Sequence, residues 1–206
     1  LFKIGTTIWL STVILAGLLI SIPDIDILKQ SARNLFFHVP MWFSMMIFFI
    51  ISLVNSVRYL RNGDLRYDTY SVEYANIGIL FGILGLVTGM IWANYTWGKP
   101  WSNDPKQIGA AIALLIYFAY MVLRNSLVDP DKRAKISAVY NIFAFAMLFP
   151  TLWIIPRLVE SLHPGGMGNP ALNTNDIDSR MRTLFWPVAV PAWTLLGVWI
   201  TTLRIR

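Results

Sequence analysis

Two histidines, His38 and His163, are the only imidazoles in this 206-residue chain. The segment ARNLFFHVPMW, residues 32–42, places His38 one residue before a long apolar run. The segment VESLHPGGMGNP, residues 159–170, places His163 directly after another such run. Neutral imidazole nitrogens are common ligands of iron and other transition metals. The two residues are therefore predicted to be metal ligands, as a pair.

Each histidine also has an ordinary interpretation when it is considered alone. The dipeptide Val39-Pro40 fits the start of a helix, so His38 could be an interfacial imidazole that hydrogen-bonds to water. The sequence Pro164-Gly165-Gly166 ends a helix at His163, whose imidazole could simply complement the helix dipole. The neighbours of each histidine must decide between these interpretations.

A third segment, TWGKPWSNDPK at residues 96–106, connects two apolar runs. It carries Trp97 and Trp101 four residues apart, then Asp104 and Lys106, and Trp92 lies just before it. Indole rings offer wide flat faces for stacking, and lysine can pair with carboxylates. A belt of tryptophans at a membrane interface is the alternative. A belt does not require this spacing or the acid, so we predict a ligand-binding loop.

Heme b is the ligand that fits these residues together. Its iron takes axial imidazoles, its ring prefers hydrocarbon, and its two propionates prefer cations and water. Thiolate ligation and iron–sulfur clusters are excluded because the sequence has no cysteine. We predict that His38 and His163 ligate the iron. The predicted partners of the propionates are Arg33, which can form two hydrogen bonds, and Lys106, which offers a point charge.

The rest of the sequence predicts an all-α integral membrane protein with six transmembrane helices in a single domain, residues 1–206. The chain is 56% hydrophobic and 14% charged, with a mean hydropathy of +0.56, whereas soluble domains are about a quarter charged. A membrane-spanning helix needs about 17–25 apolar residues. The predicted spans cover residues 4–23, 39–57, 74–97, 107–123, 136–156 and 183–203.

Some features of these runs carry further expectations. The first run is longer than the apolar core of a signal peptide and lacks a cleavage site before Pro23, so we expect a retained helix. Pro150 and Pro156 predict a kinked fifth helix that leans over a cavity within the protein. The main polar residues within or near the runs are explained by hydrogen bonds between helices. They are Asn55, Asn76 and Asn141.

Charge predicts the orientation. Six spans place both termini on one face, together with loops 58–73 and 124–135. That face holds ten of the 17 lysines and arginines: Lys3, Arg58, Arg61, Arg66, Arg124, Lys132, Arg133, Lys135, Arg204 and Arg206. Positive charge in short loops marks the cytoplasmic side, so both termini are predicted to be cytoplasmic. The histidines and the tryptophan loop then lie together on the outer face, and the net charge of +6 requires no nucleic acid.

These residues resemble the heme-handling family with a tryptophan-rich motif, which includes the CcmC, CcmF and CcsA proteins of cytochrome c maturation. The family motif reads W-G-x-x-W-x-W-D and then a basic residue. This chain has Trp97-Gly98, Trp101 and Asp104, with Asn103 replacing the last tryptophan and Lys106 the usual arginine. RNLFFHVP resembles the first histidine motif of the family, with arginine five residues before histidine. SLHPGG resembles the second, which lies thirteen residues after a proline, here Pro150.

The resemblance implies a function at the outer face of a bacterial inner membrane. The number of spans favours the CcmC type, which holds heme b through two axial histidines and presents it to a periplasmic chaperone similar to CcmE. The resemblance also implies an ABC transporter similar to CcmAB and a small CcmD-like subunit as partners, besides membrane lipid. Such a protein is a ligand presenter and not an enzyme. The alternative is the membrane subunit of a CcsA-type cytochrome c synthase, which attaches heme to apocytochrome with a CcsB-like partner.

Overall fold

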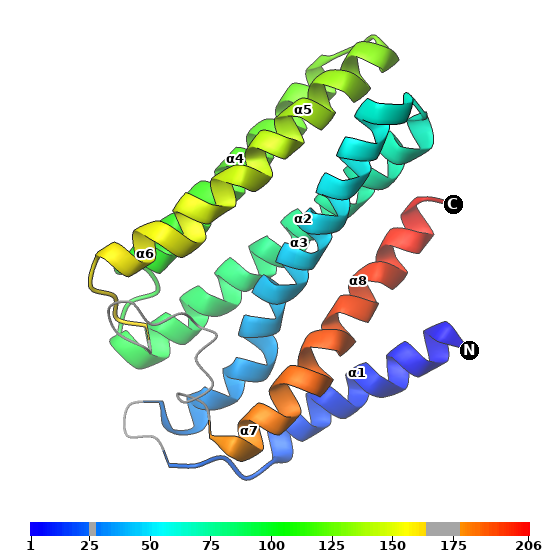
Figure 1. The fold of residues 1–206 in the computed structure, drawn as a ribbon. Coiled ribbons are helices and arrows are strands. Elements are labelled where there is room, and N and C mark those ends of the chain that lie inside the picture. Colours follow the sequence, from blue (N-terminus) through cyan, green and yellow to red (C-terminus); the bar gives the residue numbers. More distant parts are fainter. Residues whose placement is uncertain (25–27, 164–177) are drawn as a thin grey trace.

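The protein is a bundle of long helices, seen in a computed structural model that describes residues 1–24, 28–163 and 178–206 (Figure 1). Six helical segments are long and apolar enough to cross a membrane, which confirms the predicted all-α class. The helical elements are α1 (Phe2–Leu19), η1 (Lys29–Asn34), α2 (Leu35–Asn62), α3 (Leu65–Trp97), α4 (Pro105–Ser126), α5 (Pro130–Leu148), η2 (Phe149–Ile154), α6 (Ile155–Leu158), α7 (Ser179–Leu184), η4 (Phe185–Ala189) and α8 (Val190–Arg204).

The α2–α3 hairpin forms the centre of the bundle. Helices α4 and α5 pack against it on one side, and α8 with α1 packs on the other (Figure 1). Both termini lie at the end of the bundle that holds the α2–α3 and α4–α5 turns. The tryptophan loop and the segment after α6 lie at the opposite end. Which of these ends faces the cytoplasm stays a prediction from charge.

Local sequence determines where the helices begin and end. Among the described helices, four have an aspartate at the N-cap whose carboxylate accepts backbone N–H groups, which is the usual way to satisfy the free donors of a first turn. They are Asp64 of α3, Asp104 of α4, Asp129 of α5 and Asp178 of α7. Helix α3 ends at Gly98, whose φ of +74° continues the chain in the left-handed region that glycine adopts without strain.

Helix α2 begins earlier than Val39-Pro40, the helix start suggested by sequence. It starts at Leu35, directly after η1, so that His38 lies in its first turns and Pro40 lies inside it. A proline removes the N–H that would bond the carbonyl four residues earlier, here that of Phe36. The indole N–H of Trp193 on α8 donates to this Phe36 carbonyl at 3.0 Å. The helix therefore continues through Pro40 because a neighbouring helix replaces the lost hydrogen bond.

Pro150 lies in the π-helical segment η2, and Pro156 lies in α6, which follows it; an irregularity of this kind is expected where proline interrupts helical hydrogen bonding. This segment does not lean over a cavity at Thr151. A Cβ atom added to Gly109 of α4 would lie 2.0 Å from the Thr151 carbonyl oxygen. The η2 backbone therefore packs directly on α4 at this point.

A buried polar cluster joins three helices in the apolar interior. The Asn141 amide on α5 donates to the hydroxyls of Ser52 and Ser56 on α2 at 2.8 and 2.9 Å. It also lies 3.3 Å from the hydroxyl of Ser71 on α3. The predicted interhelical role is confirmed for Asn141. Asn55 instead bonds the carbonyl of Ile51 in its own helix.

Candidate functional site

His38 lies between two tryptophans on the face of α2 that meets α3. Its ring makes edge-to-face contacts with Trp42 and Trp92, with ring centroids 6.3 and 5.8 Å apart. The indole N–H of Trp92 donates to the hydroxyl of Ser31 at 3.1 Å, which fixes the indole beside the imidazole. The predicted site residue Trp92 is thus placed against His38. The simple interpretation of His38 as a water-bonded interfacial residue does not describe this packed ring.

A hydroxyl on α3 determines which nitrogen of His38 carries the proton. Nδ1 of His38 lies 3.1 Å from Oγ1 of Thr88. The Thr88 hydroxyl also has the Leu84 carbonyl of its own helix as an acceptor, at 2.7 Å. With the hydroxyl proton on that carbonyl, Nδ1 of His38 donates to Thr88, because two acceptors cannot share this contact. The proton on Nδ1 leaves the lone pair on Nε2, the nitrogen that a metal would take.

The close approach of His38 to α3 depends on Gly89. A Cβ atom added at Gly89 would lie 2.6 Å from Cε1 of the His38 ring. Real Cβ contacts do not reach this distance, so any larger residue would displace the imidazole. The glycine provides the space in which the Cε1 corner of the His38 ring approaches the helix.

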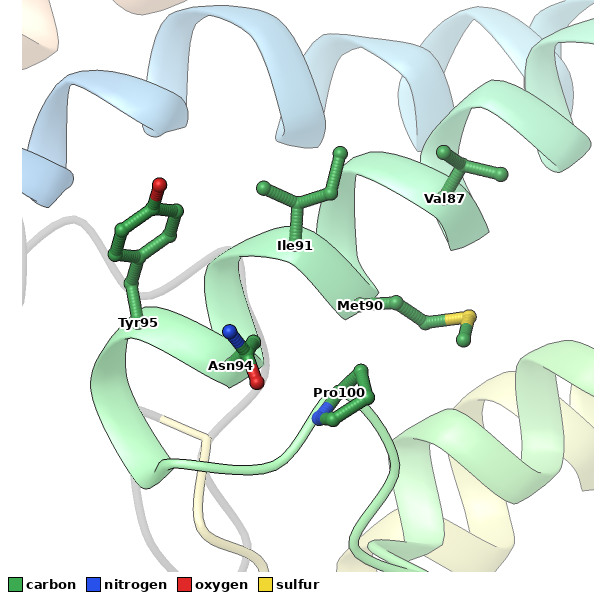
Figure 2. A pocket seen from close by; sticks show the side chains of 6 residues that line it. All are labelled: Val87, Met90, Ile91, Asn94, Tyr95 and Pro100. Carbon is green, nitrogen blue, oxygen red and sulfur yellow. The ribbon is translucent and has the colours of Figure 1, made fainter.

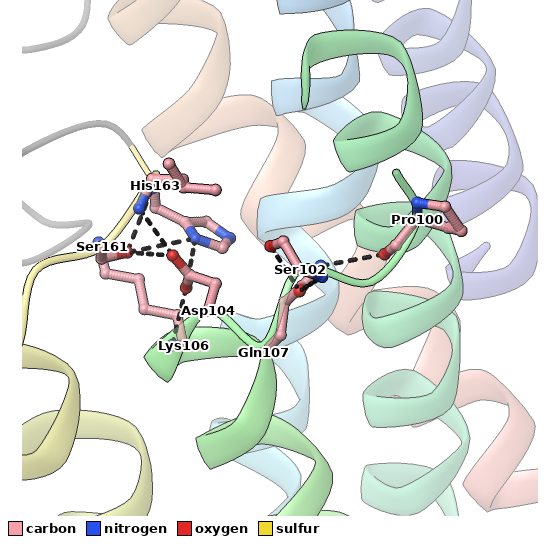
Figure 3. Close-up of polar contacts among 8 residues, drawn as sticks. Pro100, Ser102, Asp104, Lys106, Gln107, Ser161 and His163 are labelled. Atoms are coloured by element: carbon pink, nitrogen blue, oxygen red, sulfur yellow. Dashed lines mark hydrogen bonds and ion pairs between the residues drawn. The ribbon is translucent and has the colours of Figure 1, made fainter. Parts of the chain in front are cut away.

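Asp104 connects the tryptophan loop to His163 (Figure 3). One carboxylate oxygen accepts Nδ1–H of His163 at 2.9 Å and the Lys106 backbone N–H at 2.9 Å. The other accepts the Ser161 hydroxyl at 2.8 Å and the Leu162 N–H at 2.7 Å. The carboxylate is fully buried, whereas 27% of the His163 side chain is exposed. One aspartate therefore caps α4 and holds the segment that carries His163.

These contacts keep Asp104 ionised. Burial by itself raises the pKa of this carboxyl. The hydrogen bond and charge of His163, together with hydrogen bonds from Ser161 and the Lys106 N–H, outweigh that cost and hold the pKa of Asp104 well below its usual range. An ionised carboxylate only accepts hydrogen bonds, so Nδ1 of His163 must carry the proton. When the imidazole is neutral, Nε2 of His163 then carries the lone pair, as it does in His38.

The sequence suggested that His163 lies at a helix end, and the structure does not place it there. Helix α6 ends at Leu158, and Val159 is extended. The hydrogen bonds from Ser161 and Leu162 to Asp104 give this segment its position in place of helical bonds. The helix-dipole interpretation of His163 does not apply. Pro164-Gly165-Gly166, which was expected to end the helix, lies outside the described residues.

The tryptophan loop has its own internal bonds. Asn103 has a φ of +56°, a conformation that asparagine tolerates better than most residues. Its side-chain oxygen accepts the indole N–H of Trp101 at 2.8 Å. Buried Gln107 accepts from Ser102 and donates to the Pro100 carbonyl at 3.1 Å (Figure 3). Asn103, which stands where the family has a tryptophan, thus orients the indole of Trp101.

The two histidines flank the end of α3. The ring of Trp97 meets His163 with centroids 4.9 Å apart, while Trp92 of the same helix meets His38. Five residues of α-helix advance about 7.5 Å along the axis. The two imidazoles therefore meet one short stretch of one helix. Among the described residues no group of three or more His, Cys, Asp or Glu could hold a bare metal ion.

Two predicted propionate partners have other contacts. Nη1 of Arg33 donates to the carbonyls of Gly17 and Ile20, at 3.3 and 2.6 Å, and Nε donates to Gln30. Arg33 thus bonds carbonyls at the C-terminal end of α1. Lys106 gives its backbone N–H to Asp104. Contact of either side chain with a propionate stays a prediction.

A shallow apolar pocket of about 550 Å³ lies beside the loop. It is lined by Val87, Met90, Ile91, Asn94, Tyr95 and Pro100. Figure 2 shows five of these residues along α3 and Pro100 on the loop. Neither histidine lines it, and it uses a different face of α3 from the one that meets His38. Because its walls are largely apolar and lie on a membrane-spanning helix, we assign it to the lipid-facing surface.

Sequence reasoning missed three residues of this site. Thr88 bonds His38, Gln107 holds the loop, and Gly89 makes room for the imidazole. Threonine and glycine inside a long apolar helix have many structural uses, so nothing in their spacing marks them. Gln107, at the third position of α4, was counted as the first residue of a span.

Comparison with known proteins gives a family. The family model described as cytochrome C assembly protein matches residues 1–164. CcsA, the cytochrome c biogenesis protein of Parasynechococcus marenigrum, is 35% identical over 96 residues, which cover 47% of this chain and 31% of that protein. The CcsA protein of Prochlorococcus marinus strain MIT 9301 is 42% identical over 74 residues, or 36% of this chain and 23% of the relative. The matches thus span about a third of these relatives or less.

The matched part contains α1 to α6, both histidines and the tryptophan loop. The resemblance that the three sequence segments suggested is thereby confirmed at the level of the family. The chain belongs to the cytochrome c assembly protein family, which includes the CcmC, CcmF and CcsA proteins.

Proposed function

We propose that this protein holds heme b between His38 and His163 and supplies it for cytochrome c assembly. The observation that carries the proposal is the pair of imidazoles at the end of α3. Each has its Nδ1 proton engaged, by Thr88 or Asp104, which leaves the lone pair of the neutral ring on Nε2. Fixing one ring nitrogen through a hydrogen bond is how proteins prepare the other to ligate a metal.

The donor set suits iron that arrives in a porphyrin. A bare ion needs more protein ligands than two imidazoles, whereas heme brings four equatorial nitrogens and needs only axial ones. The apolar ring would lie among the indoles of Trp92, Trp97 and Trp101, which come from one helix end and its loop. Heme here is the cargo, and the protein residues bind, orient and release it.

Polar groups near the water boundary complete the proposal. Arg33 and Lys106 are the proposed partners of the propionates, which would be costly to leave unpaired close to hydrocarbon. Arg33 already donates three hydrogen bonds, so its contact with a propionate would use Nη2. The proposed site faces the periplasm of a bacterial inner membrane, as the distribution of basic loops suggests.

Two fates of the heme fit the family. In the CcsA-type fate, the protein is a subunit of a cytochrome c synthase and delivers heme to an apocytochrome. In the CcmC-type fate, it presents heme to a CcmE-like chaperone, with CcmAB-like and CcmD-like partners. The named relatives support the CcsA-type fate, and we propose it first. The six predicted spans first suggested the CcmC type, which remains the alternative.

The CcsA-type reaction is balanced without an oxidant. Each cysteine thiol of a C-x-x-C-H segment in the apocytochrome adds across a heme vinyl double bond. Sulfur bonds one vinyl carbon, the thiol proton ends on the other, and no group leaves. This protein has no cysteine, so both thiols come from the apocytochrome.

The absorption spectrum of the purified protein tests heme binding. The wild type should show a low-spin bis-imidazole spectrum, and His38→Ala and His163→Ala should each lose much of their heme and regain some with added imidazole. Tyr95→Ala is the control, because Tyr95 is an aromatic residue of the same helix end that is 79% exposed. An unchanged spectrum and occupancy in either histidine variant would refute axial ligation by that residue.

A transfer experiment distinguishes the two fates. Membranes that contain the heme-loaded protein are mixed with an apocytochrome peptide carrying C-x-x-C-H or with a CcmE-like chaperone. Covalent heme on each acceptor is then read by its in-gel peroxidase activity. The CcsA-type proposal expects the peptide to be labelled when a CcsB-like subunit is present. Labelling of the chaperone alone would favour the CcmC-type fate.

A further inference from the structure

We propose that the two imidazoles are unequal ligands. His163, paired with a carboxylate, is the strong and retained ligand, whereas His38, paired with a hydroxyl, is the weaker and exchangeable one. Thr88 and Asp104 are the positioning residues that create the difference. This inference rests on the proposed function, because it concerns ligation of heme iron.

The His38 side of the pair has a neutral acceptor. Oγ1 of Thr88 accepts Nδ1–H of His38 at 3.1 Å while its own proton points to the Leu84 carbonyl at 2.7 Å. A hydroxyl oxygen carries no net charge, so it polarises the imidazole only weakly. Its main effect is to fix the tautomer and the ring orientation.

The His163 side has an anionic acceptor. Nδ1–H of His163 donates to the buried Asp104 carboxylate at 2.9 Å. Hydrogen bonds to a charged acceptor are roughly twice as strong as neutral ones. Donation of Nδ1–H to a carboxylate raises the basicity of the other ring nitrogen and strengthens it as a metal ligand. His163 therefore gives more electron density to a bound iron than His38 does.

Of the two histidines, Asp104 contacts only His163 among the described contacts. The same carboxylate holds Ser161 and Leu162. This position of the segment places His163 in edge-to-face contact with the Trp97 ring. The elements that hold the histidines are separate: His38 belongs to the α2–α3 hairpin, and His163 to the α4–α6 side. Loss of the His38 bond would leave heme attached to His163, which Asp104 ties to the start of α4.

The protein without heme allows a first test. Nitrogen-15 NMR of the imidazoles reports which ring nitrogen is protonated. We expect both histidines to be Nδ1-protonated in the wild type. Thr88→Val, which keeps the shape but removes the hydroxyl, should mix the tautomers of His38 only, and Thr88→Ser should restore them. An unaltered His38 tautomer in Thr88→Val would overturn the role of Thr88.

The heme-loaded protein allows a second test. Asp104→Asn should lower heme affinity by about 10–100-fold and raise the reduction potential, because a less electron-rich ligand favours ferric iron less. Thr88→Val should change both quantities less. His163→Ala should lose more heme than His38→Ala. The reverse order of the two alanine variants, or an unchanged potential in Asp104→Asn, would overturn the inequality.

Ser161→Ala separates polarisation of the ligand from anchoring of the segment. This variant removes one hydrogen bond to Asp104 and leaves the carboxylate beside Nδ1 of His163. We expect it to keep the wild-type potential. A shift as large as that of Asp104→Asn would show that anchoring alone is responsible and would overturn the inference. A wild-type protein without a bis-imidazole spectrum would overturn the proposed function itself, whereas equal sensitivity on the two sides overturns only the inequality.

Discussion

The hydrogen bonds of Asp104 predict that one substitution will release the segment carrying His163. In Asp104→Ala the donors of Lys106, Ser161, Leu162 and His163 lose their acceptor. A buried donor without a partner costs about 1–3 kcal/mol. Because the His163 side chain is 27% exposed, water can satisfy part of the set. We therefore expect a local cost of about 2–4 kcal/mol, or at least about a 30-fold shift toward the released state.

Amide hydrogen exchange measures this release directly. The Leu162 N–H is bonded to the lost carboxylate, so its exchange should accelerate by at least about 30-fold. The matched control is Asp129→Ala, because Asp129 caps α5 in the same way and accepts only Asp131 and Lys132. The control should cost about 1 kcal/mol and leave Leu162 unaffected. Unchanged exchange of Leu162 in Asp104→Ala would refute the assigned role of Asp104.

The low pKa of Asp104 gives the pH dependence its sign. A carboxyl whose pKa is depressed in the folded state stabilises that state at pH values above its unfolded value of 3.8. The contribution is lost as the pH falls from that value through the lower folded pKa. Between pH 7 and about 4, Asp104 should therefore stay ionised and keep its contacts, so the segment that carries His163 should not be released. Release in the wild type near pH 5 that Asp104→Asn abolishes would contradict this assignment.

Three further predictions follow from the packing of the helices. Gly89→Ala should displace His38 and lower heme occupancy without unfolding the protein, as read from absorption and circular dichroism. Trp193→Phe should cost about 1–3 kcal/mol in denaturant unfolding, and less when combined with Pro40→Ala, which restores a backbone donor within α2. Asn141→Leu should destabilise the bundle by about 2–4 kcal/mol, because three buried hydroxyls lose a shared partner.

Each of these predictions has a control and a refuting result. For Gly89 the control is Gly5→Ala, since nothing lies within 4 Å of a Cβ atom at Gly5; equal effects of the two would refute the steric argument. For Trp193, additive costs in the double variant would show that the indole does not compensate for Pro40. For Asn141 the control is Asn55→Leu, which breaks a bond only within its own helix. A larger loss at Asn55 would contradict the interhelical role.

The sequence predicted the helices because their signal is long and redundant. Runs of about 20 apolar residues have few structures open to them in a membrane, and errors in single residues do not change the outcome. The starts and ends were less certain. Helix α2 begins at Leu35 because Trp193 replaces a hydrogen bond that Pro40 removes. That contact joins residues 157 positions apart, and local sequence contains no trace of it.

For the site too, the sequence revealed some features and only the packed structure revealed others. The types and spacing of the histidines and tryptophans were visible, because these residue types are scarce and carry distinctive chemistry. The protonated nitrogen of each imidazole was not visible. It depends on Thr88 for His38 and on Asp104 for His163, and both contacts require the helices to be packed. Asp104 was predicted as the acid of the tryptophan loop, and its bond to His163 requires the packed structure.

The placement of the histidines on different parts of the bundle connects the fold to the proposed release of heme. The two parts are joined far from the site by the Asn141 cluster and by the two-bond ion pair of Arg124 on α4 with Asp68 on α3, at 2.7 and 2.6 Å. At the other end the tryptophan loop is the covalent link between α3 and α4. His38 and His163 therefore reach the proposed heme from different elements of the bundle, and Asp104 ties His163 to the start of α4.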